Sequence, residues 1–222
     1  DFLESKLNRI EDLNLNDAEI LSIRRQWKLK SPQEQNLLRD ILPLFSLQKD
    51  QLSKILDENR SSNGIRATLD DIAKNPYILS EQYQGDDPDD FIPWGTIDRG
   101  MIPSPELGGK ALAQIDDSCR FRALLVATLQ REEPHVFTPA EIAIAKVNQR
   151  LSVLPEWKRF VFNERFLAAD EDLMSKAIEI RNEHEKTYLY LREVFEDERL
   201  LEQKLDFLMH GPDILLTTPI TE

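Results

Sequence analysis

The sequence predicts a mainly α-helical protein with a small β-hairpin near its C-terminal end. Two observations favour this fold class. Apolar residues recur at helical spacing through most of the chain, and helix-capping patterns precede several of these segments. Residues 178–191 are the exception, because apolar and polar residues alternate there on both sides of a polar stretch, as in two paired strands.

The first half of the chain is expected to fold as short helices joined by tight turns. Residues 2–13 and 17–27 have helical spacing and flank the turn Leu13-Asn14-Leu15-Asn16, which predicts a helical hairpin. Ser31-Pro32-Gln33-Glu34 is a capping box with proline at the first helical position, so a helix should run from Pro32 to about residue 45. Further helices are expected over 49–59 and, capped by Thr68, from residue 69 to a point before Pro76.

The second half has a different order of elements. Helices are expected over 117–131, from the capping box Thr138-Pro139-Ala140-Glu141 to about residue 151, and over 170–177. The hairpin of 178–181 and 187–191 follows. Three helices followed by a hairpin form a winged-helix pattern, so residues 111–222 are predicted to be a winged-helix-like α+β domain. Its last element is a long amphipathic helix over 192–209.

Composition limits the functions that this chain can perform. It has 222 residues, with 28 basic and 41 acidic side chains and a net charge of −13. A broad phosphate-binding surface needs a basic field, so contact with nucleic acid would be confined to a few local cations. The single cysteine, Cys119, cannot form an internal disulfide, and no stretch is apolar enough for a signal peptide or a membrane span. We therefore expect a cytoplasmic protein without a membrane partner.

Three turns carry a resemblance to a known family. Asn14 and Asn16 stand where helix-hairpin-helix modules have two glycines whose backbone amides approach a phosphate. A second turn, 45–48, is followed by Lys49 and Lys54. A third run, 91–99, follows Asn75-Pro76-Tyr77 and keeps Ile92, Thr96 and Asp98 of the family pattern. With the winged-helix pattern after them, these turns resemble the region that precedes the motor in RecD-like DNA helicases.

The resemblance implies a fold and a role. Residues 1–110 would form a degenerate tandem helix-hairpin-helix domain. The chain would be the non-catalytic accessory region of a bacterial RecD-like helicase, which positions nucleic acid or the motor domains of the same polypeptide and binds DNA weakly. ATP and magnesium would belong only to those motor domains, beyond residue 222. The candidate residues for nucleic-acid contact are Asn14, Asn16, Lys49, Lys54, Thr96 and Arg99 at or after these turns, together with Lys158 and Arg159 from the aromatic and basic run 157–166.

Other chemistry is sparse. Gly108-Gly109-Lys110-Ala111 lacks the first glycine and the magnesium-binding hydroxyl of a phosphate-binding loop, so no enzyme is predicted. His135, His184 and His210 are far apart in sequence, and the loop 86–90 lacks the glycine and glutamate of a calcium site, so no metal is predicted. Cys119 is interpreted as an inert thiol.

Two alternatives remain open. Residues 157–166 interleave aromatic side chains with cations, which would suit base stacking and phosphate contact, but a buried helical stripe with its charges outward is the favoured interpretation. The rival hypothesis for the whole chain is an acidic helical protein-interaction module without DNA binding. It is favoured by the charge of −13 and by the apolar stripe of the C-terminal helix, which a protein partner could cover.

Overall fold

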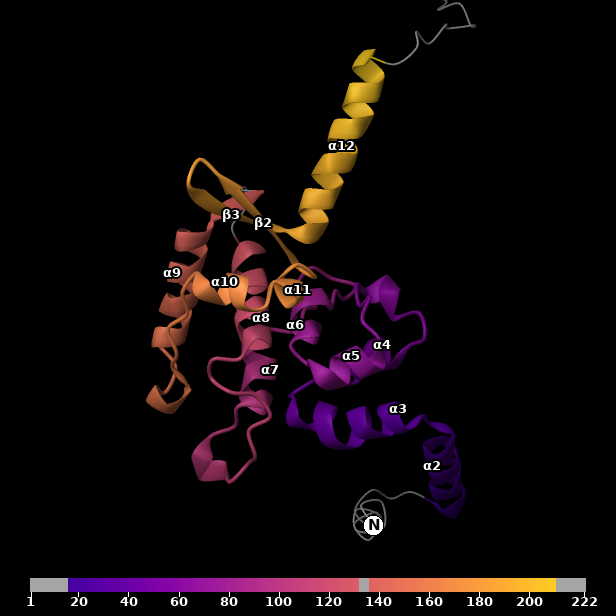
Figure 1. Cartoon of the computed structure of the whole chain (residues 1–222). Helices are drawn as coiled ribbons and strands as arrows, with labels where there is room; N and C mark the ends of the chain where they lie inside the picture. The colour runs from indigo at the N-terminus through magenta and orange to yellow at the C-terminus, as the bar shows by residue number, and fades with distance from the viewer. Residues whose placement is uncertain (1–15, 132–135, 211–222) are drawn as a thin grey trace, which may run out of the picture. The chain divides into compact units, whose positions relative to one another are not determined.

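The computed structural model describes residues 16–131 and 136–210 (Figure 1). The chain groups into two compact units, Asp1–Ile92 and Pro93–Glu222. The described part is mainly helical and contains one three-stranded antiparallel sheet, which confirms the predicted fold class at this level. The units divide after Ile92, whereas the sequence-based division was placed after residue 110.

The first described helix of unit 1, α2 (Asp17–Leu29), begins at a reciprocal cap. The Asn16 side chain accepts a hydrogen bond from the Glu19 amide (3.0 Å), and the Glu19 carboxylate accepts one from the Asn16 amide (2.8 Å). Asn16 has φ −80°, so its backbone is extended and does not adopt the left-handed conformation of a hairpin glycine. Asn14 and the helix predicted over 2–13 lie outside the described residues.

The helix predicted from Pro32 is present but changes its geometry along its length. It starts as α3 (Pro32–Asn36), capped by Ser31 as expected, continues as the π-helical segment η2 (Leu37–Ile41), and ends as the 3₁₀ turn η3 (Leu42–Leu44). Pro43 has no amide hydrogen to donate to the preceding turn, so regular α-helical bonding cannot continue through it.

The rest of unit 1 is a series of short helices around a small core. They are α4 (Lys49–Leu56), the 3₁₀ turn η4 (Arg60–Asn63), α5 (Leu69–Lys74) and α6 (Ile78–Gln82). Thr68 caps α5 as predicted, and α5 packs against α3 and η2. Gly64 has a positive φ of 77° and closes η4. The fully buried apolar side chains are Leu37, Ile55, Ile65, Ile72, Tyr77 and Leu79.

Unit 2 is built around the helix α8 (Ser118–Leu129). Neighbouring elements cover it on several sides, and nine of its twelve residues are buried. The helices α7 (Trp94–Met101), α9 (Ala140–Ser152) and α11 (Glu171–Met174) contact α8. Because α7 packs on α8, it belongs to this unit. The boundary between the two units therefore lies after Ile92 and not after residue 110. The remaining helical segments are η5 (Pro105–Leu107), η6 (Glu156–Lys158), α10 (Arg165–Ala169) and α12 (Arg192–His210).

The predicted β-hairpin is present as β2 (Ile178–Glu183) and β3 (Lys186–Leu191). Its turn consists of His184 and Glu185, both with positive φ. A third strand that the sequence analysis did not predict, β1 (Phe137–Pro139), pairs with β3, which gives the strand order β1-β3-β2. The helix α12 begins directly after β3 and extends away from the sheet (Figure 1).

Three local predictions for unit 2 were wrong. Thr138 does not cap α9, because it lies in β1 opposite Leu189, and Pro139 occupies the N-cap position without a side-chain bond. The helix predicted over 170–177 is present only as α11, which ends at Met174. Asp170 leaves the helical region (φ −142°, ψ 64°) and separates α11 from α10, which precedes it. Residues 157–166 are not one helix. Lys158 points inward and Val161 is 73% exposed, the reverse of the predicted stripe.

Candidate functional site

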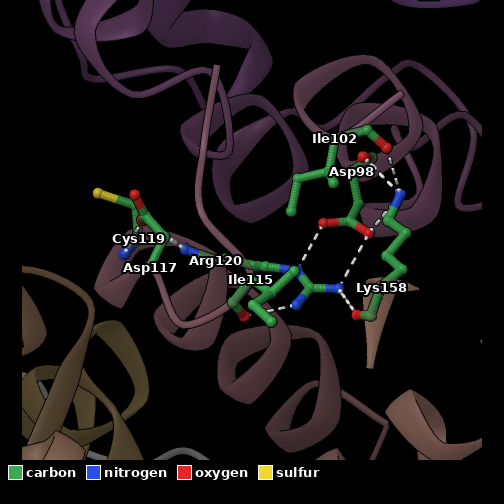
Figure 2. Close-up of polar contacts among 7 residues, drawn as sticks. All are labelled: Asp98, Ile102, Ile115, Asp117, Cys119, Arg120 and Lys158. Atoms are coloured by element: carbon green, nitrogen blue, oxygen red, sulfur yellow. Dashed lines mark hydrogen bonds and ion pairs between the residues drawn. The ribbon is translucent and has the colours of Figure 1, made fainter. Parts of the chain in front are cut away.

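Three charged side chains meet in the interior of unit 2 (Figure 2). We call Asp98, Arg120 and Lys158 the charge cluster. Arg120 donates from Nε to Asp98 Oδ1 (2.8 Å), and the Lys158 ammonium lies 2.9 Å from Asp98 Oδ2. The exposed fractions of the side chains are 0% for Arg120, 1% for Asp98 and 6% for Lys158. A single buried carboxylate therefore joins two cations from distant parts of the chain.

Backbone carbonyls complete the coordination of both cations. Lys158 Nζ donates to the carbonyls of Asp98 (2.7 Å) and Ile102 (3.1 Å), at the end of α7. Arg120 donates to the carbonyls of Ile115 (2.6 Å) and Lys158 (3.1 Å). Each cation has several acceptors, as a buried charge requires. The cluster therefore ties α7 and α8 to the segment that holds Lys158.

The local sequence explains how the three side chains reach this place. The Asp117 carboxylate caps α8 by accepting from the amides of Cys119 (2.7 Å) and Arg120 (3.2 Å), which fixes the first turn of α8 (Figure 2). The segment after Lys158 is fixed by Asn148 of α9, whose amide group both donates to and accepts from the Phe162 backbone at 2.8 Å.

The electrostatics of the charge cluster are dominated by burial. Desolvation lowers the pKa of Lys158, the hydrogen bond and charge of Asp98 act in the opposite direction, and the charges of Arg120 and Arg99 lower it further. Asp98 therefore opposes the effect of burial on the pKa of Lys158. Arg99, although exposed, is close enough for its charge to act on Lys158.

Two exposed arginines lie next to the charge cluster in sequence. Arg99 follows Asp98, and Arg159 follows Lys158, so the ion pair between Asp98 and Lys158 brings the two arginine-bearing segments together. Trp157 is 39% exposed, and the Lys158 ammonium lies 5.8 Å from its ring centre. We call Arg99, Arg159 and Trp157 the arginine patch. It combines two cations with an aromatic surface, the combination that suits a phosphate and a base.

The predicted site residues of unit 2 thus fall into two groups. The half-buried Thr96 accepts a long hydrogen bond from Arg99 (3.5 Å), and Arg159 Nε donates to the Leu154 carbonyl (2.6 Å). Both arginines remain exposed. Lys158 differs, because its ammonium is buried and bonded to protein oxygens. The expectation that Lys158 itself touches a phosphate is therefore replaced by an internal anchoring role.

The predicted turn of unit 1 at residues 45–48 connects η3 to α4, but three of its amides are bonded within the protein. Phe45 donates to the Leu42 carbonyl (3.1 Å), Leu47 donates to the Phe45 carbonyl (2.9 Å), and Gln48 donates to the Gln51 side chain (3.1 Å). The amide of Asn16, at the earlier turn, is likewise bonded to Glu19. Amides that already have an acceptor inside the protein are not available to a phosphate.

The two lysines that follow this turn differ in their surroundings. Lys49 is exposed at the start of α4. The Lys54 ammonium lies between the carboxylates of Asp86 (2.9 Å) and Asp90 (3.1 Å), and these hydrogen bonds raise its pKa. Asp90 also accepts from the Tyr83 hydroxyl at 3.0 Å. The acidic loop 86–90 is therefore attached to α4 through Lys54, which is already neutralised by protein carboxylates.

The helix α12 presents a different kind of surface. None of its residues is buried, and large apolar side chains are exposed along its length. They are Val194, Leu200, Leu201, Leu205, Phe207, Leu208 and Met209. Tyr190 of β3 packs edge-on against Phe195 (5.3 Å between ring centres), and Arg192 bonds to Glu179 of β2 (2.7 Å), so the start of α12 is fixed to the sheet.

Sequence reasoning missed Asp98 and Arg120 as site residues. A signal was present, because Arg120 and Arg122 lie within the otherwise apolar run of α8, and cations in a buried helix require acceptors. Across residues 16–131 and 136–210, no group of three or more histidine, cysteine or acidic side chains is arranged to hold a metal ion. No helix within the same residues has both the length and the apolar character to span a bilayer.

Comparison with protein-family models gives no match, and neither does comparison with curated proteins.

Proposed function

We propose that this chain is an accessory, non-catalytic region of a bacterial RecD-like DNA helicase that positions nucleic acid or the motor domains, and that the arginine patch is its point of contact with a strand. One observation carries the proposal. The Asp98–Lys158 ion pair joins α7 to the segment 157–159, so Arg99 and Arg159, the exposed neighbours of these two residues in sequence, are carried by segments that are bonded to each other.

The topology of unit 2 supports the same proposal. The element order α8-β1-α9-α10-α11-β2-β3, with strand order β1-β3-β2, is the arrangement typical of winged-helix domains, in which a hairpin follows three helical elements. The third helical element is divided between α10 and α11. Exposed acidic side chains (Glu164, Glu171, Asp172, Glu183 and Glu185) and exposed cations (Arg165, Lys176, Arg181 and Lys186) alternate over it and the hairpin. This part therefore lacks the basic field of a groove-binding surface, and we place the contact at the arginine patch.

A positional role also agrees with the remaining surface. The net charge is −13, and the amides of Asn16, Phe45, Leu47 and Gln48, at the described turns of unit 1, are bonded within the protein. A region that binds a strand through two arginines gains only part of the affinity of a basic groove. Such a contact guides a strand that other domains hold.

The test is a titration of fluorescent single-stranded and forked DNA with the full chain at several salt concentrations. Replacing both Arg99 and Arg159 with alanine should weaken binding, and the slope of log K against log salt should become less steep by about 1.4, or about 0.7 for each phosphate contact. The matched control replaces Arg24 and Arg25, two exposed arginines of α2, and should leave the slope unchanged.

The outcome decides between the hypotheses. Equal effects of the two double variants would show that only net charge matters and would remove the arginine patch from the proposal. Absence of DNA binding at low salt by the unmodified chain would favour the second candidate function, an acidic protein-interaction module. The specific observation that favours this alternative is the exposed apolar surface of α12.

A further inference from the structure

We propose that α12 is the docking surface for an amphipathic helix of another protein whose apolar side is flanked by lysine or arginine. This inference rests on the second candidate function, protein interaction, and does not depend on DNA contact. It concerns two parallel rows of side chains on α12. We call Val194, Leu201, Leu205 and Leu208 the apolar stripe, and Glu198, Glu202 and Asp206 the acidic stripe.

The apolar stripe has the spacing of a helix-binding surface. Its members recur at intervals of seven, four and three residues, which places them on one side of the helix. Leu201 is 58% exposed and Leu205 is 51% exposed, so their side chains are available to a partner. A surface hollow of about 720 Å³ beside them reaches from Phe195 to Met209. It is lined by Leu201 and Leu205, by all three members of the acidic stripe and by one cation, Arg199. A second helix could lie along this hollow.

The acidic stripe specifies the charge of the occupant. Glu198, Glu202 and Asp206 are four residues apart, so each carboxylate faces a like charge on the next turn, an arrangement that destabilises an isolated helix. Along its whole length α12 carries six carboxylates and three lysine or arginine side chains. One of these cations, Arg192, is bonded to Glu179 (2.7 Å). A partner with basic flanks would relieve the repulsion within the stripe.

The same charges argue against other occupants. A second copy of this chain would bring another acidic stripe alongside the first, and like charges in contact oppose association. An anionic membrane surface repels an acidic amphipathic helix, whereas membrane-binding helices are rich in lysine and arginine. Charge complementarity therefore selects a basic helix.

The experiment uses the full chain and two labelled synthetic peptides that share a leucine stripe, one with lysine flanks and one with glutamate flanks. Fluorescence anisotropy should show binding of the lysine peptide, weaker at higher salt, and little binding of the glutamate peptide. Replacing Leu201 and Leu205 with glutamine should weaken binding by about ten-fold or more. The matched control replaces Leu200 and Phe207, which lie outside the apolar stripe, with glutamine. This control should have little effect on the affinity for the lysine peptide.

Charge reversal provides a gain of function that loss of folding cannot imitate. With Glu198→Lys and Glu202→Lys together, the preference should change from the lysine peptide to the glutamate peptide, and circular dichroism should show unchanged helix content. Equal binding of both peptides by the unmodified chain would overturn the proposal. It would also be overturned if the Leu201/Leu205 variant and the Leu200/Phe207 control lost the same affinity for the lysine peptide. Self-association that disappears in the Leu201/Leu205 variant would overturn it in favour of a second copy. The Arg99/Arg159 variant should bind the lysine peptide normally, so failure of the DNA proposal can be told apart from failure of this one.

Discussion

Replacing Lys158 with methionine should destabilise unit 2 strongly, because the ammonium has three acceptors in the interior. The change leaves the carbonyls of Asp98 and Ile102 without this donor and removes one of the two cations beside the Asp98 carboxylate. Breaking a buried ion pair by removing one partner costs about 3–5 kcal/mol. Arg120 still pairs with Asp98, so we expect the lower end, about 3 kcal/mol.

Removing the carboxylate of the charge cluster should cost more stability than removing one of its cations. In Asp98→Asn the single buried anion is lost, and Arg120 and Lys158 remain as two buried cations beside each other. We therefore expect a loss of about 4 kcal/mol or more, near the upper end of the same range. Loss of the one carboxylate should thus lower the free energy of unfolding more than loss of one cation. This order follows from the arrangement of the charge cluster and not from burial alone.

The assay is urea unfolding followed by the fluorescence of Trp94, after Trp27 and Trp157 have been replaced with phenylalanine. Trp94 is buried, and the Arg120 guanidinium lies 5.6 Å from its ring centre, so it reports on this interior. With a slope of about 2 kcal/mol per molar urea, a loss of 3 kcal/mol moves the midpoint by about 1.5 M.

The control for this series is Lys176→Met, a change at an exposed lysine of the same unit, which should shift stability by less than about 0.5 kcal/mol. The reasoning is refuted if the Lys158 variant matches this control, or if Asp98→Asn is the milder of the two cluster substitutions.

Three further predictions concern other parts of the chain. Gly64→Ala should cost about 1–2 kcal/mol in thermal unfolding, because φ is positive at this residue and a Cβ would meet a backbone carbonyl oxygen. Gly95→Ala, where a Cβ within α7 would meet open space, should stabilise the protein by about 0.5–1 kcal/mol. Equal effects of the two substitutions would contradict this reasoning. Hydrogen bonds from the Gln51 amide and then the Lys54 ammonium lower the pKa of Asp90. The stability that ionised Asp90 contributes is therefore present above about pH 4 and is lost as the pH falls through its pKa in the folded protein. Asp90→Asn should make the free energy of unfolding depend less on pH below about pH 4, and an unchanged pH dependence there would contradict this role of Asp90. Replacing His184 and Glu185 with Asn-Gly should raise stability by about 1 kcal/mol in a thermal melt, because both residues have positive φ, and no gain would argue against strain in this turn.

Local patterns in the sequence predicted much of the secondary structure. The capping side chains of Ser31 and Thr68 mark helix starts, because their bonds involve residues only three positions away. The alternation around residue 184 identified the hairpin for the same reason, since its two strands are adjacent in sequence. The long helix α12 followed from its amphipathic spacing.

The errors arose where distant contacts decide the structure. Thr138 has the sequence of a helix cap but lies in a strand because β3, about fifty residues later, supplies its partner. Lys158 has the sequence of a surface cation but is buried because Asp98, sixty residues earlier, supplies the opposite charge. Nothing in the immediate neighbourhood of either residue identifies these partners. For the same reason the sequence predicted Arg99 and Arg159 only as members of two separate segments, 91–99 and 157–166.

The enclosure of α8 has a mechanical consequence. A helix held on several sides, with two arginines bonded to main-chain oxygens from neighbouring segments, cannot slide or rotate unless several polar bonds break together. Thermal fluctuations within this part of the molecule should therefore be small, and hydrogen exchange of its central amides should require opening of the whole body. A force applied to α12 should therefore pass through β3, which contacts both α12 and α8, to a stiff part of unit 2.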